Sequence, residues 1–190
     1  PMFGYAIPLF AFAMVMRFYD KLDLLMLKVM GGSAEQSGIY GAAQNLAFIP
    51  TILSISFSPL LLSSLSRLLA AGELTSAKQL ARHALRLVLC LLPVGTITIA
   101  TAPAIVDLIY GDEFAPTAPI LSLLIFSALG LMVVSVGTTI LIAAERPKWP
   151  VAVAAPMLPL ALWGHSLLIP RLNAMGAAWI TTLVAALGAV

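Results

Sequence analysis

The chain has 190 residues, of which 61% are apolar and only 9% are charged, with a formal net charge of +2. Soluble domains are about 45–50% apolar and about 25% charged. The composition therefore argues against a water-soluble globular enzyme, a disordered tail and a nucleic-acid binder.

Long stretches without charged residues locate candidate transmembrane helices, because about 20 apolar residues cross a bilayer. These stretches are continuously apolar and lack the alternation of membrane β-strands. We therefore predict an all-α, polytopic membrane protein with a six-helix bundle. A start at Pro1 without Met and an end inside an apolar run lead us to expect a fragment. The predicted spans are residues 3–30, 36–66, 86–106, 117–144, 149–169 and 175–190.

The segment 71–86 is the one strongly amphipathic stretch between the predicted spans. Apolar residues recur at helical spacing, and Lys78, Arg82 and Arg86 fall on another face. We expect a helix that lies at the head-group interface. A solvated charged face that leads into the next span is an equally good interpretation.

The first predicted span carries charged residues near its midpoint. Arg17, Asp20, Lys21 and Asp23 share one side of a helix, and Arg17 and Asp20 have the spacing of an ion pair. One charge at the bilayer centre costs about 2.5–3.5 kcal/mol, so we expect this side to face the bundle interior. It forms either a self-neutralised packing cluster or a polar cavity for an anionic head group or a coupling ion. Lys28 lies close enough to the end of the span to snorkel.

Polar residues in the other spans are further candidates. Tyr40, Gln44 and Asn45 lie in the second span, where they line the same cavity or form interhelical hydrogen bonds. His165 either relays a proton or packs as a hydrogen-bonded histidine. Cys90, the only cysteine, excludes an intramolecular disulfide and is expected to be inert. The chain lacks nucleotide-binding, metal-binding and hydrolase motifs, so we expect no enzyme, no cofactor and no metal site.

Basic residues in the short links predict the orientation in the membrane. The links at 67–86 and 145–148 are basic, whereas the link at 107–113 contains only acids. The basic links should be cytoplasmic and the acidic link external. Both ends of the chain should then face the cytoplasm.

Four groups of short motifs follow one another from about Pro8 to Thr182. They are Asp23-Leu-Leu-Met-Leu with Gly38-Ile-Tyr-Gly-Ala-Ala, Leu108-Ile-Tyr-Gly-Asp-Glu-Phe with Ala118-Pro-Ile-Leu, Ala143-Ala-Glu-Arg-Pro-Lys, and Gly176-Ala-Ala-Trp with Thr181-Thr. In this order they resemble the C-terminal lobe of polysaccharide-biosynthesis flippases. These proteins belong to the multidrug/oligosaccharidyl-lipid/polysaccharide exporter superfamily.

The resemblance implies one lobe of a two-lobe transporter that cycles between inward- and outward-facing states. It implies transport of an undecaprenyl-diphosphate-linked oligosaccharide across the bacterial cytoplasmic membrane. The family's basic residue maps onto Arg17 and its acid onto Asp23, while the pair Asp20-Lys21 departs from the family pattern. Expected partners are membrane lipids, the lipid-linked oligosaccharide, an N-terminal lobe of the same chain, and a polysaccharide polymerase or glycosyltransferases.

Two alternatives to a flippase remain open from the sequence. A drug/cation antiporter of the same superfamily would use the acids to bind a cation or a proton. A membrane scaffold of a polysaccharide-assembly complex would use the charged cluster only for stability.

Overall fold

The chain is helical over nearly its whole length in the computed structural model, which describes residues 2–30 and 33–189. Helices account for 90% of the described residues, and no strand occurs among them. The elements are α1 (Met2–Val29), α2 (Ala34–Ala47), α3 (Ile49–Ala70), α4 (Leu74–Leu89), α5 (Leu92–Tyr110), the 3-10 helix η1 (Asp112–Phe114), α6 (Thr117–Ala143), α7 (Lys148–Ala154) and α8 (Met157–Gly188).

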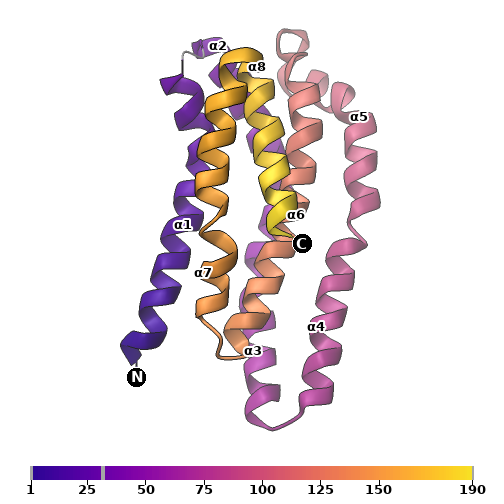
Figure 1. The fold of residues 1–190 in the computed structure, drawn as a ribbon. Coiled ribbons are helices and arrows are strands. Elements are labelled where there is room, and N and C mark those ends of the chain that lie inside the picture. The colour runs from indigo at the N-terminus through magenta and orange to yellow at the C-terminus, as the bar shows by residue number, and fades with distance from the viewer. Residues whose placement is uncertain (1, 31–32, 190) are drawn as a thin grey trace.

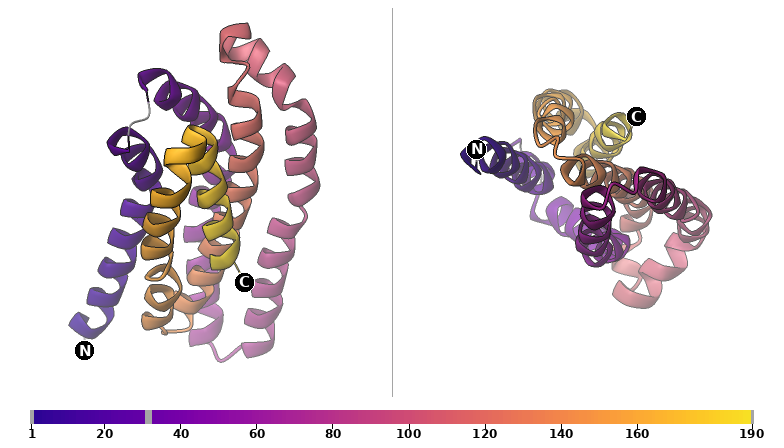
Figure 2. Two further views of the ribbon diagram at one scale, coloured as in Figure 1. Left: turned by 45° about the horizontal axis from the view of Figure 1, so that its top comes forward. Right: turned by 90° about the horizontal axis from the view of Figure 1, so that it is seen from below.

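The helices form one elongated bundle with α6 at its centre (Figures 1 and 2). Helix α6 packs against α2, α3, α4, α5 and α8, and most of its side chains are buried. Helix α1 lies at the edge of the bundle, where it packs against α2, α7 and α8. One side of α1 is therefore left open along its length.

Prolines mark the breaks between consecutive helices. Pro50 and Pro93 lie in the first turns of α3 and α5, and Pro156 is the N-cap of α8. Proline lacks a backbone N–H and is tolerated in the first helical turn, where that N–H has no partner. The pairs α2–α3 and α4–α5 consequently run on in the same general direction through the bundle (Figure 1).

Helix α8 reverses direction at Asn173. This residue has non-helical angles, φ 49° and ψ −130°, so two helical segments meet there, and the second runs back along the bundle (Figure 1). Glycines allow the segments to approach closely. A Cβ added at Gly176 would lie 2.5 Å from the carbonyl oxygen of Leu168, and one at Gly164 would lie 2.8 Å from the side chain of Ile180.

Four helical stretches in the described residues are long and apolar enough to cross a membrane. They are Ile49–Ala70, Leu74–Tyr110, Thr117–Ala143 and Lys148–Gly188. The predicted number of six differs from this count for two physical reasons. In the part of α1 whose side chains the structure describes, four charged residues lie between positions 17 and 23 and keep it out of this set, and the last two predicted spans lie in one stretch that reverses at Asn173. The chain is nevertheless an all-helical, multi-pass membrane protein.

The amphipathic segment predicted at 71–86 corresponds largely to α4. Its small residues Ala77 and Ala84 are buried on the side that packs against α3 and α6. Lys78 and Arg82 are exposed on the other side. In Figure 1, α4 continues roughly along the line of α5, and its position at a membrane surface stays a prediction.

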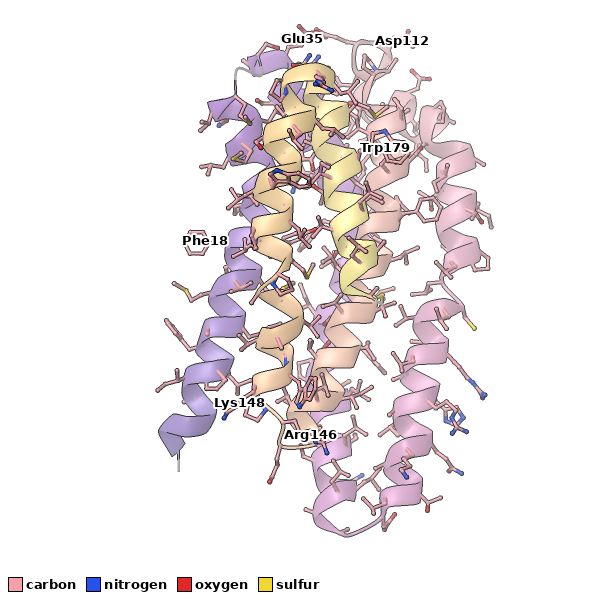
Figure 3. All side chains as sticks on the ribbon, viewed as in Figure 1. Phe18, Glu35, Asp112, Arg146, Lys148 and Trp179 are labelled. Carbon is pink, nitrogen blue, oxygen red and sulfur yellow. The ribbon has the colours of Figure 1, made fainter. Side chains whose placement is uncertain are left out.

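Charged side chains gather at the two ends of the bundle (Figure 3). Glu35 and Asp112 lie at one end, and Arg146 and Lys148 lie at the other. This separation follows the alternation of acidic and basic links in the sequence. The direction of the bundle in the membrane stays a prediction.

Candidate functional site

The carboxylate of Asp23 is the best-connected polar group inside the bundle. Asp23 lies on α1 and is only 3% exposed. Its Oδ2 accepts hydrogen bonds from Tyr40 Oη at 2.6 Å and from Gln44 Nε2 at 3.2 Å. Its Oδ1 accepts one from the backbone N–H of Leu24 at 2.8 Å. Tyr40 and Gln44 are one turn apart on α2, so both reach the same carboxylate.

Further hydrogen-bonded polar groups extend this site to α6 and α8. Tyr40 Oη lies 3.5 Å from Thr181 Oγ1. The backbone carbonyl of Thr181 accepts hydrogen bonds from Tyr19 Oη at 3.0 Å and from Ser127 Oγ at 3.4 Å. One continuous polar network thus joins four helices, and we call these residues with Asp23 and Gln44 the Asp23 network.

Neutral groups alone satisfy the Asp23 carboxylate in the described part of the chain. Its three donors are a phenol, a carboxamide and a backbone amide, and no ion pair to it is present there. A buried ion without a counter-charge depends on such hydrogen bonds, because removal from water is otherwise costly. The network therefore holds a carboxylate that has no basic partner of its own.

The other charged residues of α1 do not enter the bundle. Arg17, Asp20 and Lys21 are all exposed, and no ion pair joins Arg17 to Asp20 within the described residues. Our expectations of an inward-facing charged side and of this ion pair were wrong except for the position of Asp23. The reason is packing: the face of α1 that carries Tyr19 and Leu22 makes the buried contact.

The predicted residues of the second span are divided in the same way. Tyr40 is fully buried and Gln44 is half-buried in the Asp23 network, whereas Asn45 is exposed. Of the seven candidate residues, three meet in one hydrogen-bonded site. The exposed remainder are Arg17, Asp20, Lys21 and Asn45.

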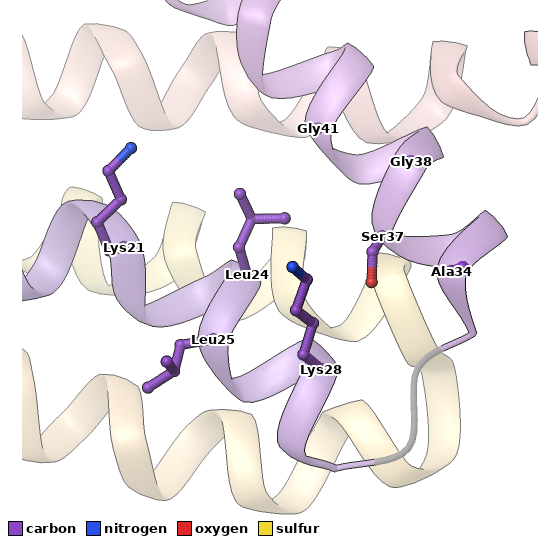
Figure 4. Close-up of a pocket in the computed structure, with 8 residues that line it drawn as sticks. All are labelled: Lys21, Leu24, Leu25, Lys28, Ala34, Ser37, Gly38 and Gly41. Carbon is purple, nitrogen blue, oxygen red and sulfur yellow. The ribbon is translucent and has the colours of Figure 1, made fainter.

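An open cavity of about 680 Å³ lies between α1 and α2. Figure 4 shows the side chains of Lys21 and Lys28 extending from α1 on this side, with Ser37 on α2 beyond them. The cavity is lined by Lys21, Leu24, Leu25, Lys28, Ala34, Ser37, Gly38 and Gly41. It thus combines two cationic side chains with a wall of small residues.

Several residues of the site were not among the sequence candidates. Tyr19 is buried on α1 and its hydroxyl donates a hydrogen bond to the carbonyl of Thr181. Its spacing of four residues from Asp23 was the available signal, since such residues share a helix face. Thr181 and Ser127 carried no signal, because their contacts depend on how α6 and α8 pack.

Two further sequence candidates behave differently from expectation. His165 is buried, but its Nδ1 has no hydrogen-bond partner among the described residues, so it is not the hydrogen-bonded packing histidine. Cys90 is exposed rather than packed. Within the described residues, no three His, Cys, Asp or Glu side chains gather in a metal-binding arrangement.

Comparison with known proteins gives one match. A family model described as "Polysaccharide biosynthesis protein" matches residues 1–119, which cover α1 to α5, η1 and the start of α6. The matched part contains the Asp23 carboxylate, its α2 donors and the whole lining of the α1–α2 cavity. No curated protein and no solved structure matches the chain.

Proposed function

The chain belongs to the polysaccharide biosynthesis protein family, and from this premise we propose that it translocates a polyprenyl-diphosphate-linked oligosaccharide across the cytoplasmic membrane. The transport step would follow alternating access, in which a site opens to one side of the membrane at a time. A partner lobe, a polymerase and glycosyltransferases would work with it in cell-envelope polysaccharide assembly.

The observation that carries this proposal is the exposure of Arg17, Asp20 and Lys21 near the middle of a bundle helix. Charged side chains within a membrane rarely face lipid and usually line a polar or water-filled path. The open side of α1 is therefore best explained as one wall of such a path. A hydrophilic head group needs a path of this kind to cross the bilayer.

The charged residues have distinct proposed roles on this wall. Arg17 and Lys21 attract the diphosphate, and the planar guanidinium of Arg17 suits two-point contact with phosphate oxygens. Asp20 and Asp23 set the local field or couple transport to an ion. Tyr40 and Gln44 hold the Asp23 carboxylate through the hydrogen bonds described above, and Asn45 lies exposed on the same helix.

One observation favours a second candidate, a drug/cation antiporter. Asp23 is a buried carboxylate with neutral donors only, and such a group is suited to take up a proton or a cation. In a flippase the same group would serve coupling rather than substrate binding. A scaffold role remains the third alternative, in which the network would only stabilise the bundle.

Transport assays in liposomes distinguish these functions. A flippase moves a fluorescent polyprenyl-diphosphate sugar so that its head group becomes accessible on the opposite side. A cation antiporter instead takes up a cationic dye against an imposed proton or sodium gradient. If the folded protein shows neither of these activities, the result favours the scaffold role.

A further inference from the structure

Three basic residues form a row along the open side of α1. Taking Arg17 as the reference, the helical rotation places Lys21 and Lys28 within about 40° of it. The row extends for roughly 16 Å at a rise of about 1.5 Å per residue. All three side chains are exposed, so the row continues from the middle of α1 to its last turn.

The part of this row from Lys21 to Lys28 borders the α1–α2 cavity. Both Lys21 and Lys28 line the cavity, and no acidic residue is among its lining residues. The opposite wall is formed by α2, where a Cβ added at Gly38 or Gly41 would meet nothing within 4 Å. The cavity therefore has room for a ligand and an excess of positive charge. Its volume of about 680 Å³ is within the range of small-molecule sites.

Ser37 supplies a second, independent indication of a ligand. Its Oγ is buried, and it has no hydrogen-bond partner among the residues that the structure describes. Buried polar atoms are nearly always hydrogen-bonded in native proteins, so an unsatisfied hydroxyl in a cavity wall indicates a missing partner. Figure 4 shows Lys28 and Ser37 on the two sides of the same space. An anionic oxygen there would accept a hydrogen bond from Lys28, and one from Ser37 once the side chains that cover its Oγ move aside.

We propose that Lys21, Lys28 and Ser37 form a binding site for the phosphate group of a lipid head group in the α1–α2 cavity. Its identification with the transported diphosphate rests on the proposed function. In that case Arg17 and Lys21 first attract the diphosphate near mid-helix, and Lys21 together with Lys28 and Ser37 then holds it nearer the end of α1. The cavity is then a second binding position on the path, nearer to the end of α1 than the first.

A binding measurement tests the site without requiring transport. The protein is purified in an uncharged maltoside detergent, which contains no phosphate, and titrated with farnesyl diphosphate in a calorimeter. Farnesol, phosphatidylglycerol and inorganic phosphate are titrated in parallel. The variants are Lys28→Gln and Ser37→Ala, and Lys148→Gln at the opposite end of the bundle is the matched control. Thermal unfolding shows that each variant is folded.

The proposal predicts that Lys28→Gln weakens farnesyl diphosphate binding by about 10- to 100-fold, since a charged hydrogen-bond partner is lost. Ser37→Ala should weaken it less, and Lys148→Gln should leave it unchanged. Equal effects of Lys28→Gln and Lys148→Gln, or farnesol binding as well as farnesyl diphosphate, would overturn the site and leave Lys28 as a snorkelling residue.

The other probes identify the source of the phosphate. Phosphatidylglycerol binding with the same dependence on Lys28 would assign the site to a membrane lipid, whereas inorganic phosphate binding alone would show that no lipid chain is needed. Binding that depends on Lys28 in a protein that moves no lipid-linked sugar in liposomes would retain the site and reject the proposed function. Transport that persists without such binding would retain the proposed function and reject the site.

Discussion

The hydroxyl of Tyr40 donates a 2.6 Å hydrogen bond to Oδ2 of Asp23, and this contact joins α2 to α1 inside the bundle. Both residues are buried, with Tyr40 at 0% and Asp23 at 3% exposure. Because no basic side chain is paired with the carboxylate among the described residues, this short bond is its principal support. The bond adds to the packing of α1 against α2, α7 and α8.

Tyr40→Phe removes this bond while it retains the aromatic ring. We expect the free energy of unfolding to fall by about 1.5–3 kcal/mol, the usual contribution of a hydrogen bond to a charged group. Thermal unfolding in detergent measures the change. Tyr110→Phe is the control, since the Tyr110 hydroxyl makes no hydrogen bond in the described part of the chain. Equal stability of the two variants would contradict the importance of the Asp23 network.

Gly176→Ala should destabilise the reversal in α8. The added Cβ would lie 2.5 Å from the carbonyl oxygen of Leu168, and this backbone atom cannot move aside without separating the two segments. Overpacking of this kind costs about 1–3 kcal/mol. Gly137→Ala is the matched control, because a Cβ there meets nothing within 4 Å. A melting temperature lowered equally by both substitutions would mean that the close approach is not needed.

The class of fold was predictable from the sequence, but the inward face of α1 was not. Apolar stretches between charged links predict helices, and helices occupy these stretches. Helical spacing also places Arg17, Lys21 and Asp23 relative to one another. It does not determine which side meets α8, and the buried contact of Tyr19 with Thr181 settles that question. The sequence therefore led us to expect that Arg17 and Lys21 are buried in the bundle, whereas both are exposed.

Long-range contacts explain the rest of what sequence reasoning missed. The reversal lies in the predicted link between the spans 149–169 and 175–190, but the non-helical angles of Asn173 that produce it were not predicted. Thr181 enters the site only because the second segment of α8 folds back along the bundle. The unpartnered hydroxyl of Ser37 likewise depends on how α2 sits against its neighbours. The contacts of Thr181 and the environment of Ser37 have no local sequence pattern.

A water-filled path beside α1 predicts selective labelling of cysteine substitutions. The background is Cys90→Ser, because Cys90 is exposed. Lys21→Cys should react with a charged, water-soluble maleimide, since thiols react only where water ionises them. The control is Ile97→Cys on α5, where the native side chain is 63% exposed on the outside of the bundle. This cysteine should remain unmodified because it faces lipid. Similar labelling of both positions would argue against a path limited to the α1 side.

The predicted orientation can be checked with the same reagent in intact cells. Asp112→Cys, in the acidic link, should react from outside because that link is expected to be external. Glu145→Cys, beside Arg146 and Lys148, should react only after the membrane is permeabilised. The reverse pattern would invert the topology and place both ends of the chain outside.

Transport by an Arg17→Ala variant tests whether α1 carries the site for a lipid-linked diphosphate. The protein is reconstituted in liposomes, and movement of a fluorescent polyprenyl-diphosphate sugar is followed for the wild type and the variant. Lys148→Ala at one end of the bundle controls for loss of a positive charge. We predict transport by the wild type and the control, and its loss in a folded Arg17→Ala protein. Unchanged transport by Arg17→Ala, or none by a folded wild type, would rule out this role of α1.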